Sequence, residues 1–276
     1  MTTPRADLSS TANPRVKATL RLRDRRERDR TGLTLVDGAR EARRAIEAGV
    51  AIVEAFVCEP QADSDDARSV LKMLARGRGW TAVSQMVSER LAFGDRADGI
   101  VVVIRSPVRS LESLDLPPDP LLVVVEGVEK PGNLGAILRS ADGAGASAVI
   151  AADPRTDLFN PNVIRASLGT VFSVPTAVAS SGEVLEWLTA HSIPIVAARV
   201  EGSVDYTDAD LSGPLAIALG SEARGLSDAW GELAVASVRV PMLGVADSLN
   251  VSATAAILFY EALRQRADAE ATRRPG

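Results

Sequence analysis

The stretch that most constrains the fold of this chain runs from Leu121 to Ile150. It opens with a continuous apolar run at 121–125, which is typical of a strand buried on both faces of a parallel sheet. A loop rich in glycine and proline follows at 126–133, apolar residues then recur at helical spacing up to Gly145, and 148–150 begins another strand. This β-loop-α-β unit places its loop at the carboxyl end of a strand, where open α/β sheets bind ligands.

Two side chains in this unit carry groups that can act on a ligand. Asn133 lies at the start of the predicted helix, and Arg139 follows about a turn and a half later. Both residues also have structural interpretations, because Pro-Gly-Asn is a common turn and helix cap and a lone arginine is often solvated. The chain has no Gly-x-Gly-x-x-Gly and no Gly-Lys-Ser/Thr motif, so it lacks the dinucleotide and P-loop signatures.

Cysteine and histidine are almost missing from the 276 residues. Cys58 is the only cysteine and His191 the only histidine, which excludes an internal disulfide and a Cys/His zinc site. We therefore expect no metal, and we expect Cys58 to be a buried thiol. An enzyme of this composition would draw proton transfer or charge stabilisation from arginine, carboxylates, amides or its substrate.

No targeting or membrane segment is visible in the sequence. No apolar run approaches the length of a membrane span, and the first residues lack an apolar signal region. We therefore expect a cytoplasmic protein that does not associate with a membrane.

Charge is unevenly distributed along the chain. The net charge is −5, yet 14–30 holds eight basic and three acidic residues, a local balance of 8 − 3 = +5. Such asymmetry indicates a nucleic-acid-binding face. A solvated amphipathic helix with internal ion pairs between residues four apart explains the same pattern, and both interpretations stay open.

The order of the predicted elements indicates two α/β domains. We expect a disordered tail at 1–12, a smaller α/β domain at 13–105, a proline-containing linker at 106–120, a second α/β domain with a mostly parallel sheet at 121–266, and a charged tail at 267–276. Strands are expected at 33–36, 52–57, 81–83, 100–104, 121–125, 148–152, 195–198, 215–219 and 235–240. Helices are expected at 14–30, 39–48, 67–76, 88–92, 133–143, 160–168, 181–190 and 252–265.

Two further polar loops leave strands of the second predicted domain. One spans 217–226 and carries two glycines and a carboxylate, and the other spans 240–252 and leads into the last helix. Ser248, Asn250 and Ser252 can cap that helix. Because the carboxyl ends of parallel strands meet at one edge of a sheet, these loops and the loop at 126–133 predict a shared pocket rich in exposed backbone groups.

Together these three stretches resemble the SpoU/TrmH branch of the SPOUT RNA methyltransferases. The matching motifs are Asn133–Ser140, Leu219–Gly225, and Val240–Met242 with Ser248–Ser252, and the likeness continues through 164–172. It covers 120–265 strongly, whereas the N-terminal part is more weakly similar to the family's substrate-binding domain of ribosomal-protein type. The motifs look most like those of 23S ribosomal RNA ribose methyltransferases, including the members that confer antibiotic resistance. Ser140 and Val240 are mild departures from the family pattern.

The resemblance implies a fold, a cofactor and a set of site residues. The catalytic domain would contain a C-terminal trefoil knot, bind S-adenosylmethionine in a bent form, and build its active site across a homodimer interface. Backbone groups would hold the adenosine at Leu219, Gly220, Val240, Met242 and Leu249. The catalytic residues would be Arg139, Asn133, Glu222, Ser248 and Asn250. RNA would be bound by Arg165 at the target nucleotide and, from the basic segment, by Arg21, Arg25 and Arg28.

The leading hypothesis is an S-adenosylmethionine-dependent RNA methyltransferase acting on a ribose 2′-hydroxyl, with 23S ribosomal RNA as the expected substrate. Arg139 is expected to clamp a phosphate and stabilise the developing alkoxide, because guanidinium is almost never deprotonated. A tRNA 2′-O-methyltransferase, a catalytically silent RNA-binding protein and a nucleotide-dependent oxidoreductase are the alternatives. A purely structural role for Glu222, paired with Arg224 or with backbone donors, also stays open.

Overall fold

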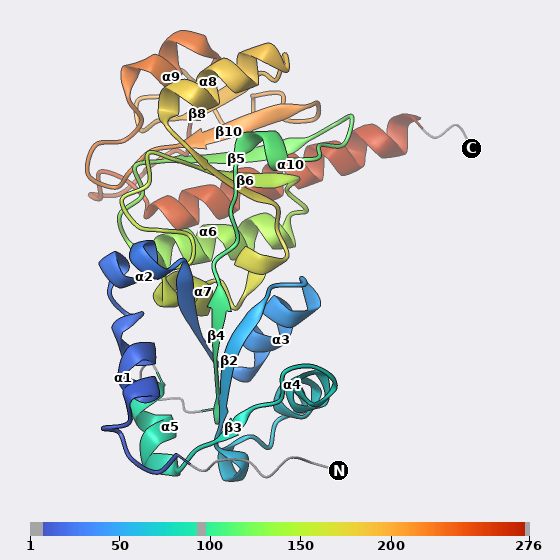
Figure 1. Cartoon of the computed structure of the whole chain (residues 1–276). Coiled ribbons are helices and arrows are strands. Elements are labelled where there is room, and N and C mark those ends of the chain that lie inside the picture. The colour runs from blue at the N-terminus through green and yellow to red at the C-terminus, as the bar shows by residue number, and fades with distance from the viewer. Residues whose placement is uncertain (1–7, 93–97, 274–276) are drawn as a thin grey trace. The chain divides into compact units, whose positions relative to one another are not determined.

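The computed structural model describes residues 8–92 and 98–273. The chain divides into two compact units (Figure 1), which we call the N-terminal unit and the C-terminal unit. The N-terminal unit runs to Val108 and also includes Asp157–Ser173, whereas the C-terminal unit comprises Arg109–Thr156 and everything from Val174 onward. The sequence predicted that 157–173 would belong to the second domain, so the structure differs from the predicted boundaries there.

The N-terminal unit is built on a four-stranded sheet of order β1-β4-β2-β3. Its strands are β1 (Leu33–Asp37), β2 (Ile52–Val57), β3 (Thr81–Ala82) and β4 (Ile100–Arg105). Strand β4 is antiparallel to both β1 and β2, and β3 is parallel to β2. The apolar residues of β4 are buried, as a central strand with covered faces requires.

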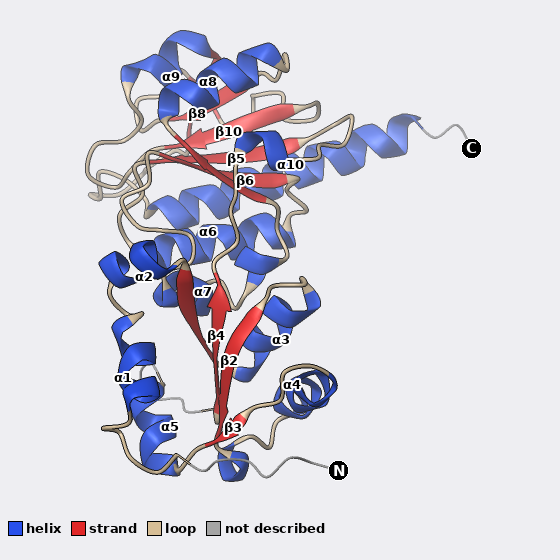
Figure 2. Cartoon of the chain, viewed as in Figure 1, coloured by secondary structure: helices blue, strands red, loops and turns tan. Residues whose placement is uncertain are grey.

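Helices lie on both sides of this sheet. They are α1 (Pro14–Arg21), α2 (Arg25–Thr31), α3 (Ala39–Glu47), α4 (Asp65–Arg76), α5 (Gln85–Leu91) and α7 (Pro161–Ala166), with short turns η1 (Glu59–Gln61) and η3 (Thr170–Phe172). In Figure 2, α1 and α5 lie on one side of the strands, and α3 and α4 lie on the other. A core cluster includes Val16, Leu35, Phe56 and Leu91.

The prediction of one basic helix at 14–30 is wrong. The segment forms two helices, because Asp24 has an extended backbone and caps α2 by accepting a hydrogen bond from the Arg26 amide at 2.8 Å. Arg28 is only 5% exposed and donates to the backbone oxygens of Leu22 and Arg23 at 2.9 and 2.8 Å. Its Nη2 atom also pairs with Asp157 Oδ2 at 2.6 Å. Arg28 therefore has a structural role, which corrects its predicted role in RNA binding.

The segment at 157–173 packs against β1 within the N-terminal unit. Helix α7 contacts β1, and the buried Thr34 hydroxyl donates to the Phe159 carbonyl at 2.6 Å. Arg44 donates to the Leu168 carbonyl at 3.0 Å. A sequence pattern does not reveal such a return of the chain, because each partner lies more than a hundred residues away.

The predicted N-terminal tail falls mostly outside the described residues, which begin at Leu8. Leu8 forms a parallel β-bridge with Val83, and its amide donates to the Ala82 carbonyl at 3.0 Å. Leu8, which the sequence placed in a disordered tail at 1–12, is therefore paired with the strand segment at 82–83.

The C-terminal unit contains a seven-stranded sheet of order β7-β6-β5-β10-β8-β11-β9. Its strands are β5 (Leu121–Glu126), β6 (Ala148–Ala152), β7 (Thr176–Ala179), β8 (Ile195–Ala198), β9 (Val204–Asp205), β10 (Leu215–Leu219) and β11 (Ala234–Arg239). Every pairing between these described strands is parallel. The continuous apolar runs of β5, β6 and β10 are fully buried except at Glu126, which confirms the predicted central strands.

Helices cover both faces of the parallel sheet. They are α6 (Pro131–Gly143), α8 (Ser181–Ala190), α9 (Asp228–Leu233) and α10 (Val251–Arg273), with a short turn η2 (Leu111–Ser113). Figure 1 shows α6 and α10 on one face and α8 and α9 on the other. Leu111 of the predicted linker is buried in the core cluster of this unit.

Helix α10 is longer than its sequence pattern predicted. It continues to Arg273, so most of the predicted 267–276 tail is helical and only 274–276 lie outside the described residues. Within residues 8–92 and 98–273, no helix combines the length and apolar character needed to cross a bilayer.

Candidate active site

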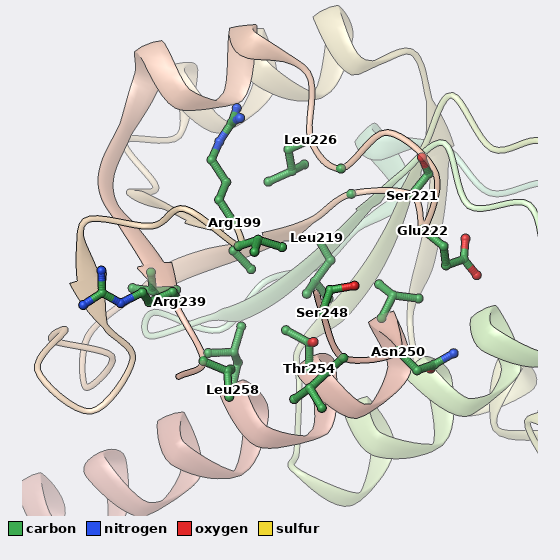
Figure 3. A pocket seen from close by; sticks show the side chains of 18 of the residues that line it. Arg199, Leu219, Ser221, Glu222, Leu226, Arg239, Ser248, Asn250, Thr254 and Leu258 are labelled. Carbon is green, nitrogen blue, oxygen red and sulfur yellow. The ribbon is translucent and has the colours of Figure 1, made fainter. Parts of the chain in front are cut away.

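A cavity of about 650 Å³ lies at the carboxyl ends of β8, β10 and β11 (Figure 3). Three chain segments at strand ends and the first turns of α10 form its walls. Eight of the ten residues predicted for catalysis and cofactor binding line it, namely Leu219, Gly220, Glu222, Val240, Met242, Ser248, Leu249 and Asn250. Lys130, in the loop that precedes α6, lines the cavity as well, so the structure brings all three loops together around one pocket.

The turn after β10 depends on Gly220. A Cβ atom at this position would lie 1.9 Å from the Gly225 carbonyl carbon, so only glycine fits. The Gly225 amide donates to the Ser221 carbonyl at 2.9 Å, and the Arg224 amide donates to Ser221 Oγ at 3.3 Å. Gly225 itself has a φ of +66°, which glycine adopts without strain. These contacts close 220–225 into a tight turn with its backbone beside the cavity.

The loop before α10 ends in a helix cap. Asn250 Oδ1 accepts hydrogen bonds from the Ser252 amide at 2.9 Å and from Ser252 Oγ at 2.6 Å. This confirms the capping role predicted for Asn250. The cap fixes the position at which Ser248, Leu249 and Asn250 meet the cavity.

Three polar side chains connect the three motif loops. Asn133, in the first turn of α6, donates through Nδ2 to Glu222 Oε1. Asn250 Nδ2 donates to Asn133 Oδ1 at 3.2 Å. Glu222 therefore contacts Asn133 rather than the Arg224 side chain or the loop backbone, and Asn133 joins the site through two residues that line the cavity.

Arg139 is not brought to the cavity of its own chain. Six residues of helix turn α6 by roughly 600°, so Asn133 and Arg139 leave it on different faces. Arg139 is exposed, and within the part of the chain that the structure describes its guanidinium has no ion-pair or hydrogen-bond partner. It is therefore a solvent-facing cation in the single chain.

The residues predicted to bind RNA lie in the N-terminal unit. Arg165 of α7 pairs through Nη1 with Asp37 Oδ2 at 2.7 Å, and both line a smaller cavity of about 330 Å³. The side chains of Arg21 and Arg25 are 65% and 53% exposed, with nitrogens 3.7 and 3.6 Å from Glu27 and Asp29. Such long contacts between exposed groups hold an arginine only weakly.

Sequence reasoning missed one wall of the cavity. Arg199, Val200 and Glu201 line it directly after β8, and Arg239 lines it at the end of β11. The rule that drew attention to the other loops, a polar segment at the carboxyl end of an apolar strand, applies equally to Arg199 and Glu201. Among the residues described, no three His, Cys, Asp or Glu side chains are grouped as a metal site would need.

Comparison with known protein families decides the assignment. The profile of the SpoU rRNA Methylase family matches residues 120–260, more than half of the chain. The chain belongs to the SpoU rRNA methylase family. A second profile, the MRM3-like substrate binding domain, matches residues 13–102 of this SpoU protein. The predicted family and the predicted α/β fold class are both confirmed.

Relatives of this SpoU protein include characterised enzymes. It is 33% identical over 251 residues to the 23S rRNA (uridine(2479)-2′-O)-methyltransferase of Streptomyces viridochromogenes, covering 89% of this chain and 87% of that one. It is 39% identical over 148 residues to the 23S rRNA (guanosine-2′-O-)-methyltransferase RlmB of Pseudomonas syringae pv. tomato, covering 53% and 59% of the two chains.

Solved structures extend the likeness over nearly the whole chain. A crystal structure of an RNA 2′-O ribose methyltransferase superposes with a TM-score of 0.84 at 45% identity. The match covers 95% of this chain and 100% of that one. The Streptomyces viridochromogenes methyltransferase AviRb, in complex with AdoMet, gives a TM-score of 0.83 at 32% identity, with 93% and 100% covered.

Proposed function

We propose that this SpoU family protein transfers a methyl group from S-adenosylmethionine to a ribose 2′-hydroxyl of 23S ribosomal RNA. The observation that carries the proposal is the cavity lined by eight of the predicted site residues and joined to Asn133 by hydrogen bonds. The names of the relatives and the AdoMet complex of one of them support it.

The cavity fits S-adenosylmethionine in size and in chemistry. Its volume of about 650 Å³ lies within the range of small-molecule sites, which is roughly 300–1,000 Å³. Backbone groups of Leu219, Gly220, Val240, Met242 and Leu249 would hold the adenosine, and the missing Cβ of Gly220 lets the turn close against Gly225 beside the cavity. The bound cofactor supplies an electrophilic methyl group on a sulfonium, which a hydroxyl can attack without a metal.

The chain's own residues would position the ribose and stabilise charge. Arg139 would clamp a phosphate by its fork of donors and stabilise the 2′-alkoxide as it forms. Asn133, Glu222, Ser248 and Asn250 would orient the reacting groups and the cofactor. Asn133 and Glu222 already hold each other in place, so that part of the arrangement exists before any ligand binds.

We further propose a homodimer formed through the C-terminal unit. Arg139 is exposed and does not line the cavity of its own chain, so it can take part in catalysis only at the cavity of another protomer. In such a dimer, Arg139 of one protomer would complete the site of the other. A trefoil knot around the cofactor site and a cytoplasmic location are parts of the same proposal, supported by membership of the family.

The N-terminal unit would choose the RNA, with Arg165 at the target nucleotide. We expect the double substitution of Arg21 and Arg25 to glutamine to weaken RNA binding and to flatten its dependence on salt. Because each phosphate contact contributes about one unit to the slope of log affinity against log salt, the slope should fall by about 2. The measurement is a salt titration of RNA binding, with cofactor affinity measured alongside.

Arg68→Gln is the matched control for this double variant. The Arg68 side chain, on α4, is 58% exposed, which is close to the exposure of Arg21 and Arg25, although Arg68 is paired more closely, with Asp65 at 2.6 Å. It should leave the slope unchanged. A slope equal to that of the wild type in the double variant would show that this surface does not touch phosphates.

The function itself is tested by methyl transfer from labelled S-adenosylmethionine to unmethylated ribosomal RNA and, separately, to tRNA. We expect label in ribosomal RNA only, at ribose, as shown by nucleoside analysis. Label in tRNA alone would favour the tRNA methyltransferase. Cofactor binding without label in either RNA would favour the catalytically silent RNA-binding protein.

A further inference from the structure

Ser227, which directly follows the cavity-lining Leu226, is held from two sides. Glu126, the last residue of β5, accepts from the Ser227 amide at 2.7 Å through Oε2 and from the Ser227 hydroxyl at 2.8 Å through Oε1. From β8, Arg199 Nη2 donates to the Ser227 carbonyl at 2.6 Å. One residue therefore has its amide, hydroxyl and carbonyl all bound by two charged side chains, an arrangement we call the Ser227 clamp.

Glu126 is well suited to hold a backbone segment. Burial alone would raise the pKa of its carboxyl, but the Ser227 amide, the nearby Trp230 indole N–H and the Ser227 and Ser181 hydroxyls together keep that pKa below its usual value. The Ser181 hydroxyl donates to Oε1 at 2.9 Å. Glu126 is thus an ionised, half-buried acceptor, and hydrogen bonds to a charged acceptor are the stronger kind.

Arg199 is fixed by its surroundings as well as by Ser227. A Cβ atom at Gly231 of α9 would lie 3.1 Å from Arg199 Nη2, so the guanidinium packs closely over this glycine. Figure 3 shows the Arg199 guanidinium turned toward the helix above it and away from Ser248 and Asn250. Arg199 therefore lines the cavity with its stem while its charged end holds the loop.

The clamp bears on the cofactor site because contacts within the preceding turn close it into one tight unit. Gly220 and Gly225 touch, and the bridge between Ser221 and Gly225 closes 220–225. Only the buried Leu226 separates this turn from Ser227. The position of the turn that carries Ser221 and Glu222 (Figure 3) therefore depends on how Ser227 is held.

The geometry points to Glu126 and Arg199 as positioning residues for S-adenosylmethionine, acting through Ser227 on the wall of the cavity formed by 220–226. This inference rests on the proposed function. It adds two residues, neither of them among the predicted site residues, that set cofactor affinity without touching the reacting atoms.

The test compares Glu126→Ala with Glu126→Gln in the full chain. Alanine removes both hydrogen bonds between Glu126 and Ser227 and leaves only the bond from Arg199, so we expect the dissociation constant for S-adenosylmethionine, measured by calorimetry, to rise about tenfold or more. Glutamine can accept from the amide and donate to the two hydroxyls, so it should restore affinity to within about threefold of the wild type. Affinity for ribosomal RNA should not change in either variant.

Glu129→Ala is the matched control, because Glu129 lies in the same connection between β5 and α6 but pairs with Arg155 at 3.1 Å. It should bind the cofactor as the wild type does. Equal cofactor affinity in folded Glu126→Ala and wild type would overturn the inference, as would an equal loss in Glu129→Ala. Ser227→Ala, which removes only the hydroxyl, provides a milder variant if Glu126→Ala fails to fold.

Amide exchange without any ligand separates this inference from the proposed function. In Glu126→Ala, or in Ser227→Ala if that variant replaces it, amides at 221–227 should exchange faster while those of α6 keep their wild-type rates. Unchanged exchange at 221–227 would overturn the clamp. A wild-type protein that binds no S-adenosylmethionine would instead overturn the proposed function, and the exchange result would still decide whether the clamp exists.

Discussion

Arg139→Ala is expected to lower the rate of methyl transfer about a thousandfold, since loss of one preorganised charge-stabilising group typically removes a hundredfold to a thousandfold. Affinity for S-adenosylmethionine should stay unchanged, because the proposed partners of Arg139 are an RNA phosphate and the 2′-oxygen rather than the cofactor. The measurement is single-turnover transfer at saturating RNA and cofactor, with calorimetry for cofactor binding. The side chain is exposed, so the variant should fold normally.

Arg139→Lys distinguishes the clamp from a simple cation. Lysine keeps the charge but loses the fork of donors, so most of the rate should still be lost. Near wild-type turnover in this variant would mean that the bidentate clamp is wrong. Arg155→Ala is the control, since the Arg155 side chain is also exposed, at 52%, and pairs with Glu129. It should retain wild-type turnover.

Gly220→Ala is expected to weaken S-adenosylmethionine binding by at least about a hundredfold, the equivalent of roughly 2.7 kcal/mol. The added Cβ would meet the Gly225 backbone at 1.9 Å, so the turn must open and the cavity wall must shift. No flexible side-chain end is available to move aside. Calorimetric titration of the purified variant with S-adenosylmethionine measures the effect.

The control for this variant is Gly182→Ala. Gly182 lies in the first turn of α8, and an added Cβ there would meet nothing within 4 Å. It should bind the cofactor normally, and alanine should if anything favour the helix. If Gly220→Ala bound S-adenosylmethionine with wild-type affinity, the cavity described here would not be the cofactor site.

Elements with a strong local pattern could be predicted from the sequence, and those without one could not. Strands β2, β6, β8 and β10 have the predicted bounds, because continuous apolar runs between turn residues mark buried strands clearly. Strand β9 has only two residues, and β7 has the sequence Thr-Ala-Val-Ala. Neither therefore shows a hydrophobic pattern long enough to predict a strand. Helix α9 was missed for the same reason, having only six residues.

The candidate site was predictable to the extent that it depends on strand ends. Glycines, amides and carboxylates after β10 and β11 meet because parallel strands bring their carboxyl ends to one edge. Arg28 shows where this kind of reasoning fails. The arginines beside Arg28 in the sequence have the same charge and similar spacing. Arg28 differs from them because it pairs with Asp157, 129 residues away, and is buried.

The return of 157–173 to the N-terminal unit has a consequence for how the protein is made. On the ribosome, residues 8–108 emerge well before this segment, while Arg28 still lacks Asp157 and Thr34 still lacks the Phe159 carbonyl. The N-terminal unit can reach its final packing only after synthesis has passed Ser173, when about a third of the other unit, 48 of its 151 residues, has been made. The two units therefore cannot fold one after the other, as domains joined by a simple linker can.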